Sequence, residues 1–237
     1  MKRQINNNTY KLNYGVSLFG NKLKTSKQMK SNFCFDGATP IIYKTSKDGE
    51  IIIESIEHAF RKHENEEIYV CGHTFDETEH TSKMSWVSAK LCHTLAVKQI
   101  CVYLTPTELI SDLESDNIIR VTPNHVFPIL TKDGYKDVEA YLLQRGDKLI
   151  AELNRIQSVD EDVDVDENGE PKLEWILEDG SSHYIEYRNV SKVVEEDVND
   201  SSAFGVNFYG VVINEPCESK YFMLCNSVIS HDSSVDY

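Results

Sequence analysis

Three short stretches of this sequence contain side chains that could cleave or transfer an acyl group. The stretches are "SNFCFDG" near residue 34, "RVTPNHVFPIL" near residue 125 and "ISHDSS" near residue 232. Their reactive side chains are those of Cys34, Thr122, His125, His231, Asp232 and Ser233. A thiol and a hydroxyl are nucleophiles that can carry an acyl group, and a histidine exchanges protons near neutral pH. These residue types predict acyl-transfer chemistry if the fold brings the three stretches together.

The charge of the chain changes sharply at Cys34. Residues 1–33 contain seven Lys or Arg and no Asp or Glu. Residues 34–237 contain 17 basic and 39 acidic side chains, which is a net charge of −22. The sequence therefore joins a basic arm, residues 1–33, to a strongly acidic body, and Cys34 stands at the boundary between them.

Length and composition are those of a soluble globular domain. The 237 residues are 40% hydrophobic and 10% aromatic, which suits one hydrophobic core of about 200 residues after the basic arm. No apolar run approaches the roughly 20 residues that a membrane span requires, and the N-terminus lacks the apolar core of a signal peptide. The six cysteines therefore favour reduced thiols, and we expect a cytoplasmic protein.

The pattern of apolar residues predicts an all-β fold. Short β-rich runs, separated by turn signals, are "TPIIYKT", "EIIIESI", "EIYVCG", "KQICVYL", "NIIRVT", "HVFPIL", "GVNFYGVVIN" and "KYFML". The two helix candidates are residues 107–114 and the stretch "VEAYLLQRGD" at residues 138–147. Residues from about 153 to 195, which include "VDEDVDVDENGEP", are expected to form an acidic, solvated linker.

The three reactive stretches resemble, in their order, the characteristic sequence blocks of inteins, the self-splicing domains of the hedgehog and intein (Hint) family. "CFDGATPII" is similar to the opening block, "NIIRVTPNHVFPIL" to the block with a Thr-x-x-His motif, and "KYFMLCNSVISHDS" to the closing block. The resemblance covers residues 34–232 and assigns residues 1–33 and 233–237 to the N-terminal and C-terminal extein segments. The acidic linker is too short for a homing endonuclease domain, so the resemblance is to a mini-intein.

The resemblance implies a horseshoe-shaped Hint domain of mostly antiparallel strands with minor helix. The first and last strands would lie side by side, so that both splice junctions meet in one central cleft. In such a domain, Cys34 attacks the carbonyl group of Phe33 in an N-to-S acyl shift. His125, with a pKa near neutrality, would protonate the departing amide nitrogen, and Thr122 would hydrogen-bond the same peptide unit.

The resemblance also implies the downstream steps. The hydroxyl group of Ser233 would take the acyl group by transesterification, and His231 would assist cleavage after residue 232. In the family, an Asn at that position cyclises through its side-chain amide, but this sequence has Asp232. A carboxylate is a poor nucleophile, so this step is expected to be slow or arrested. The preceding turn departs as well, because Asn226-Ser227 stands where Asn-Gly is usual.

Protein splicing acts in cis on the flanking extein segments. It implies no cofactor and no metal ion, with neither nucleic acid nor a membrane as partner, and we expect a monomer. A second interpretation within the Hint family stays open. It is an autoprocessing domain that cleaves only at Cys34, and Asp232 is the residue that favours it.

A third interpretation is a β-rich zinc and nucleic-acid-binding module. Its support is the basic arm, which could contact phosphates, and a Cys/His-rich stretch. The stretch consists of Cys71, His73, His80, Cys92, His93 and Cys101. Its spacing matches no common zinc site, and the acidic body would repel a polyanion. Splicing therefore remains the favoured interpretation.

Overall fold

The computed structural model describes residues 33–76, 81–106, 117–152, 156–157, 174–175, 180, 182–198, 205–214 and 216–233. These residues lie in one unit of the chain, Ser31–Tyr237. Except for Phe33, the basic arm lies outside the described residues, and so does the helix predicted at residues 107–114.

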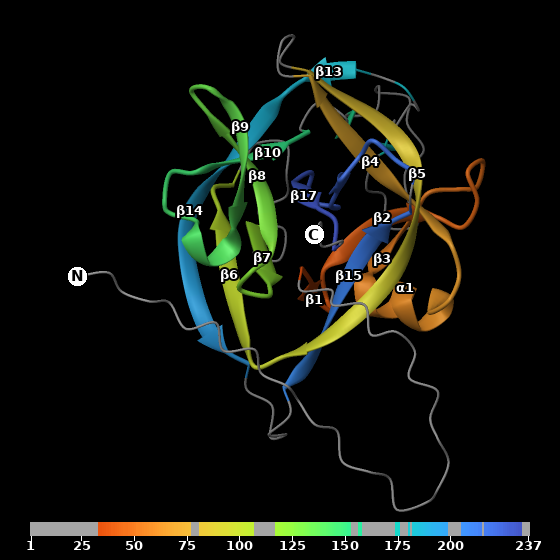
Figure 1. Ribbon diagram of the computed structural model, residues 1–237, viewed down its shortest axis with the longest axis horizontal. Helices are drawn as coiled ribbons and strands as arrows, with labels where there is room; N and C mark the ends of the chain where they lie inside the picture. Colours follow the sequence, from red (N-terminus) through yellow and green to blue (C-terminus); the bar gives the residue numbers. More distant parts are fainter. Residues whose placement is uncertain are drawn as a thin grey trace, which may run out of the picture. The chain divides into compact units, whose positions relative to one another are not determined.

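Strands form most of the described structure, and every strand pairing there is antiparallel (Figure 1). The strands are β1 (Phe35–Asp36), β2 (Pro40–Lys44), β3 (Ile52–Ser55), β4 (Ile68–Asp76), β5 (Thr81–Ala96), β6 (Lys98–Leu104), β7 (Ile118–Val121), β8 (Val126–Thr131), β9 (Gly134–Glu139), β10 (Lys148–Ala151), β11 (Ile156–Gln157), β12 (Glu174–Trp175), β13 (Ser182–Tyr184), β14 (Glu186–Asp197), β15 (Val206–Ile213), β16 (Tyr221–Met223) and β17 (Ile229–His231). The helices in this part of the chain are α1 (Ile56–His63) and the 3-10 helix η2 (Ala140–Leu142), and neither is long and apolar enough to span a membrane. The predicted all-β class, with mostly antiparallel strands and minor helix, is confirmed.

Each of the eight β-rich runs identified in the sequence overlaps a strand. The two longest strands, β5 and β14, were not among these runs. In β5, buried Met84 and Trp86 alternate with more exposed Lys83 and Ser85, so the strand lacks an apolar run. Its only signal is an alternation with a period of two residues, and small polar side chains weaken that signal.

Helix α1 is not one of the two predicted helices, although its sequence carries helix signals. Ser55 occupies the N-cap and accepts a hydrogen bond from the backbone nitrogen of His58 at 3.4 Å. Glu57 and Arg61 form an i,i+4 ion pair at 2.6 Å, and Ala59 is buried. The apolar run of β3 leads directly into the helix, so the strand pattern obscures the helix start.

The helix predicted at residues 138–147 is wrong except for the three residues of η2. Val138 and Glu139 belong to β9. After η2, Leu143 is extended with a ψ of 146°, and the carboxylate of Asp147 accepts a hydrogen bond from the nitrogen of Gln144 at 2.8 Å. The Asp side chain thus closes a turn and competes with continuation of the helix.

The predicted acidic linker extends too far toward the C-terminus. Strand β13 pairs with β5, and β14 pairs with β6 and β10, although the predicted linker runs to about residue 195. Arg188 and Val190 of β14 are buried, whereas Tyr187, Asn189 and the following Ser191 are exposed. The polar residues of this segment therefore form the outer face of a strand of the main sheet.

Strand β15 lies between β5 and β1 in the main sheet. The prediction that the first and last strands lie side by side is wrong, because β1 pairs with β15 and β7, while β17 pairs with β16. Both ends attach to β15 instead. Phe35 of β1 is paired with Tyr209, and the backbone nitrogen of Ser233 donates a hydrogen bond to the oxygen of Val211 at 2.6 Å.

Aromatic side chains fill the core close to these ends. Phe35, Phe127 and Phe222 are almost fully buried, and the rings of Phe35 and Phe222 meet edge to face at 5.9 Å. The imidazole of His125 packs against Phe35 at 4.3 Å and against Phe127 at 4.7 Å between ring centroids. One of the predicted site residues is therefore part of the apolar core.

Candidate acyl-transfer site

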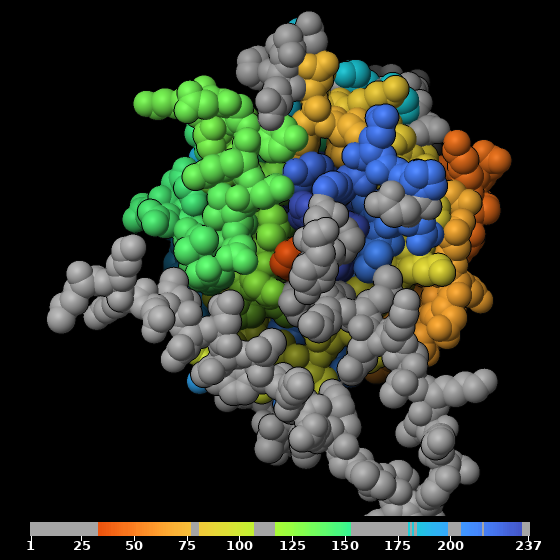
Figure 2. All heavy atoms as spheres, viewed as in Figure 1, coloured from red at the N-terminus to blue at the C-terminus, as the bar shows by residue number. Residues whose placement is uncertain are grey.

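Residues from the two predicted splice junctions are in contact. The hydroxyl group of Ser233 donates a hydrogen bond to the carbonyl oxygen of Phe33, although 200 positions separate the two residues. Figure 2 shows the first described segment, in red-orange, beside the last one, in dark blue, between the green and the lighter blue segments. A nucleophilic hydroxyl thus lies next to the carbonyl group that acyl transfer would use.

The backbone of Cys34 is fixed by Thr122. The amide nitrogen of Cys34 donates a hydrogen bond to Oγ1 of Thr122 at 3.1 Å, and the nitrogen of Thr122 donates to the carbonyl oxygen of Cys34 at 2.8 Å. Cys34 is fully buried and Thr122 is 4% exposed. Thr122 therefore contacts the nitrogen atom of the Phe33–Cys34 peptide bond, which is the atom that would leave in an N-to-S acyl shift.

His125 lies against the two neighbours of Cys34. Its ring centroid is 6.4 Å from that of Phe33 and 4.3 Å from that of Phe35. Burial, reinforced by the nearby charge of His231, lowers the pKa of His125 to about 3. The expectation of a pKa near neutrality is wrong, because the sequence does not reveal that this ring lies in the apolar core. His125 is neutral at pH 7.

His231 and Asp232 form a buried pair at the other junction. Nδ1 of His231 lies 2.9 Å from the carbonyl oxygen of Asp232 and 3.3 Å from its carboxylate oxygen Oδ1. Burial alone would lower the pKa of His231, but the hydrogen bonds and charge of Asp232, with a contribution from Asp137, raise it above the ordinary value. The imidazole therefore favours its protonated form beside the Asp232 carboxylate.

The backbone and carboxylate of Asp232 are both held by neighbouring strands. Its nitrogen donates a hydrogen bond to the oxygen of Lys220 at 2.8 Å, and Oδ2 accepts one from the nitrogen of Ile213 at 3.1 Å. The side chain is almost fully buried. The bond from Ile213 occupies a lone pair of Oδ2, which makes the carboxylate less nucleophilic.

The sequence did not single out Ser230, which lies between the two junctions. Its hydroxyl is 2.7 Å from Nε2 of His125 and donates a hydrogen bond to the carbonyl oxygen of His231 at 3.2 Å. Ser230 is fully buried. A polar residue in the otherwise apolar "VIS" run was the available signal, since a buried hydroxyl needs a partner.

Gly210 is the second residue that the sequence did not single out. It occupies the middle of β15, and the hydroxyl of Ser233 lies where its side chain would be, with the oxygen of Phe33 in tight contact. A glycine inside a strand pattern often marks a close approach of another segment, so "NFYGVVI" carried this signal.

The Cys/His-rich stretch divides among several environments. Sγ of Cys71 is 3.5 Å from Nε2 of His73, whose Nδ1 is 3.2 Å from the hydroxyl of Ser82. Cys101 donates to Glu196 at 3.2 Å, which is a separate contact. His80 lies outside the described residues, and among those described no group of three or more His, Cys, Asp or Glu side chains could hold a metal ion.

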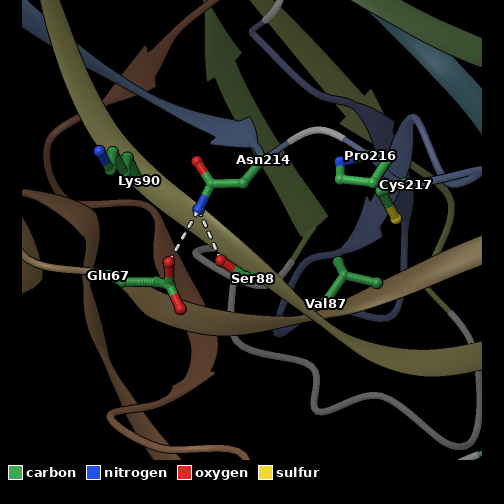
Figure 3. A pocket seen from close by; sticks show the side chains of 7 residues that line it. All are labelled: Glu67, Val87, Ser88, Lys90, Asn214, Pro216 and Cys217. Carbon is green, nitrogen blue, oxygen red and sulfur yellow. Dashed lines mark hydrogen bonds between the residues drawn. The ribbon is translucent and has the colours of Figure 1, made fainter.

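A polar pocket lies at the end of β15 (Figure 3). The side-chain nitrogen of Asn214 donates hydrogen bonds to Ser88 at 2.5 Å and to Glu67 at 3.4 Å, and these three side chains point toward one another. None of the predicted site residues lines this pocket. It is therefore distinct from the place where the two junctions meet.

No protein-family model matches the sequence, and no curated protein matches it. Solved structures do match. The transcription factor IIB Mvu mini-intein is 15% identical over 84% of this chain and 99% of that chain, with a TM-score of 0.50. The PabCDC21-1 intein is 16% identical over 84% and 98% of the two chains, with a TM-score of 0.48. The bacterial intein-like domain from Clostridium thermocellum is 17% identical over 84% and 99%, with a TM-score of 0.44.

Identities this low bear on the fold alone, and the first of these three structures carries that comparison. The likeness to that structure extends over 84% of this chain and supports the all-β fold. This chain has the fold of an intein.

Proposed function

We propose that this chain is a mini-intein precursor that splices itself in cis, with residues 34–232 as the intein and residues 1–33 and 233–237 as extein segments. The observation that carries this proposal is the hydrogen bond from the Ser233 hydroxyl to the Phe33 carbonyl oxygen. All reacting groups belong to one chain, so a cytoplasmic monomer without cofactor or metal ion is sufficient.

The first proposed step is an N-to-S acyl shift at the upstream junction. The sulfur of Cys34 attacks the carbonyl carbon of Phe33, the carbon–nitrogen bond breaks, and the amine of Cys34 receives a proton. His125 is neutral at pH 7, so it acts first as a base that takes the thiol proton and then returns that proton to the nitrogen. Thr122 holds the nitrogen during this exchange.

The second proposed step is transesterification to Ser233. The hydroxyl oxygen of Ser233 attacks the thioester carbonyl, the bond to the sulfur of Cys34 breaks, and the hydroxyl proton passes to that sulfur. The contact between Ser233 and Phe33 supports this step, because a hydroxyl held beside the carbonyl replaces a bimolecular encounter. The product is a branched ester in which residues 1–33 are attached to the side chain of Ser233.

The third proposed step, cleavage after residue 232, is slow or arrested in this chain. The carboxylate of Asp232 accepts a hydrogen bond from the backbone nitrogen of Ile213. It also lies beside the imidazole of His231, whose pKa is raised. A carboxylate stabilised in this way is a poor nucleophile toward its own carbonyl group. The same observation favours a second candidate function, a Hint autoprocessing domain that cleaves only at Cys34.

Incubation of the purified chain with dithiothreitol tests the upstream half of the proposal. The thiol should intercept the thioester and release residues 1–33 from residues 34–237, as measured by mass spectrometry. Cys34→Ala should abolish this cleavage, whereas Cys71→Ala should leave it intact because Cys71 contacts His73 away from the junction. Equal cleavage in the Cys34→Ala chain would end the proposal.

A further inference from the structure

Gly210 lies inside strand β15, and neighbouring groups fill the space beside its Cα atom. A Cβ atom added there would lie 2.1 Å from the hydroxyl oxygen of Ser233 and 3.0 Å from the carbonyl oxygen of Phe33. It would also lie 3.0 Å from Sγ of Cys92, the residue of β5 that pairs with Gly210. The Ser233 hydroxyl therefore occupies the volume that the side chain of any other residue would fill, and the Phe33 carbonyl oxygen borders that volume.

A glycine in the middle of a long strand needs a reason. It lacks a side chain that could pack against its neighbours, and its backbone is the most flexible of all residues. Gly210 is nevertheless flanked by Tyr209 and Val211, which are both buried and paired with β5. The neighbouring residues of β15 thus belong to the buried core, and Gly210 is the position in this strand without a side chain.

We propose that Gly210 is a positioning residue for acyl transfer, because its missing side chain leaves the space in which the Ser233 hydroxyl reaches the Phe33 carbonyl. This inference rests on the proposed splicing function. It assigns to Gly210 an effect on the transesterification step and none on the N-to-S shift at Cys34, whose backbone contacts come from Thr122.

The geometry explains why the effect should be selective. The severe overlap is with the end of the Ser233 side chain, which can rotate away about a single bond. The Phe33 oxygen and the Cys92 sulfur need to give way by only a few tenths of an ångström. A methyl group at position 210 would therefore turn the hydroxyl away from the carbonyl while the sheet stays intact.

The test is Gly210→Ala in an Asp232→Asn background, in which release at the downstream junction is expected to proceed. Ligation should slow on the order of 10²-fold, the scale for misplacing a reacting group by about 1 Å, while dithiothreitol cleavage at Cys34 stays within about twofold. The matched control is Gly37→Ala, whose added methyl would lie 3.0 Å from the ring of Tyr209 and 3.1 Å from Glu57. An unchanged ligation rate in Gly210→Ala, or an equal loss in Gly37→Ala, would overturn the inference.

A stability measurement separates this inference from the proposed function. In a Cys34→Ala background, which cannot form the thioester, Gly210→Ala should lower the midpoint of thermal unfolding less when Ser233 is also replaced by Ala. The carbonyl ¹³C chemical shift of Phe33 should change in Gly210→Ala toward its value in Ser233→Ala. Additive midpoint shifts and an unchanged carbonyl resonance would refute the role of Gly210 whether or not the chain splices.

Discussion

Nε2 of His125 and the hydroxyl oxygen of Ser230 lie 2.7 Å apart, although 105 positions separate these fully buried residues. The same hydroxyl donates to the carbonyl oxygen of His231 at 3.2 Å. One hydroxyl therefore links the imidazole of the upstream histidine to the backbone of the downstream junction, and it holds the ring in its orientation.

Replacing Ser230 by Ala should slow dithiothreitol cleavage at Cys34 by roughly 10-fold or more, because a misoriented His125 loses part of the 10²-fold or larger effect of a positioned acid–base group. The rate of cleavage, followed by mass spectrometry, is the measurement. Ser230→Thr keeps the hydroxyl and should recover most of the rate. If both variants cleave like the parent chain, or if both are equally slow, the hydroxyl has no part in the reaction.

Acid should destabilise the fold through His125. Its pKa is about 3 in the folded chain and about 6.5 in an unfolded one. Between these values only the unfolded state binds the proton, so the free energy of unfolding falls as the pH falls. At pH 5 this group should cost roughly 2 kcal/mol relative to pH 7.

Chemical denaturation at pH 7 and pH 5 measures this effect. In a Cys34→Ala background, His125→Gln should remove the roughly 2 kcal/mol contribution, because glutamine does not titrate. Other groups are unchanged in this comparison, so the difference between the two chains isolates His125. The same pH dependence in both chains would mean that His125 is not buried in its neutral form.

Asp232→Asn should lower the pKa of His231. The raised pKa of His231 depends on hydrogen bonds and attraction from Asp232, and the amide removes the negative charge. The stability that this pair contributes is present below the pKa of the unfolded histidine and is lost as the pH rises through the folded value. An imidazole titration followed by NMR should show the lower pKa, and a pKa that stays or rises would contradict the assigned pairing.

Ser227→Gly should stabilise the fold by about 1 kcal/mol. Ser227 has a φ of 66°, and its buried hydroxyl has no hydrogen-bond partner among the described residues. Relief of about 1–2 kcal/mol of left-handed strain and loss of the unpaired hydroxyl outweigh the roughly 0.5–1 kcal/mol that glycine adds in unfolded-state entropy.

The midpoint and slope of urea denaturation give the free energies for this comparison. Ser227→Ala is the matched control, because it removes the hydroxyl and keeps the strained backbone. The glycine variant should be the more stable of the two. A less stable glycine variant would show that the left-handed turn after Asn226 is not strained.

The sequence predicted the strands and the reactive residue types better than it predicted their surroundings. Runs such as those of β4 and β6 carry their own apolar signal, and the Cys34, Thr122 and Ser233 positions follow motifs. The low pKa of His125 depends on Phe35 and Phe127, which enclose the ring only after long-range pairing. Burial of this kind is a property of the assembled core and leaves no local pattern.

The roles of Ser230 and Gly210 were missed for a related reason. A serine in an apolar run and a glycine in a strand are weak signals until their partners are known. The partners here are His125 and Phe33, each more than 100 positions away. Likewise, the motifs indicated that both junctions meet, but only the strand pairings identify β15 as the element that both ends attach to.

Splicing by this chain is tested most directly by the mass of the products of Asp232→Asn. The change restores an amide nucleophile with almost the same side-chain volume and removes the carboxylate that pairs with His231. We expect excision of residues 34–232 and a 38-residue product that joins Phe33 to Ser233 and contains "KSNFSSVDY". Ser233→Ala in this background should stop ligation and still permit cleavage. A single intact Asp232→Asn chain, under conditions where dithiothreitol cleaves at Cys34, would contradict splicing and leave a domain that processes one junction only.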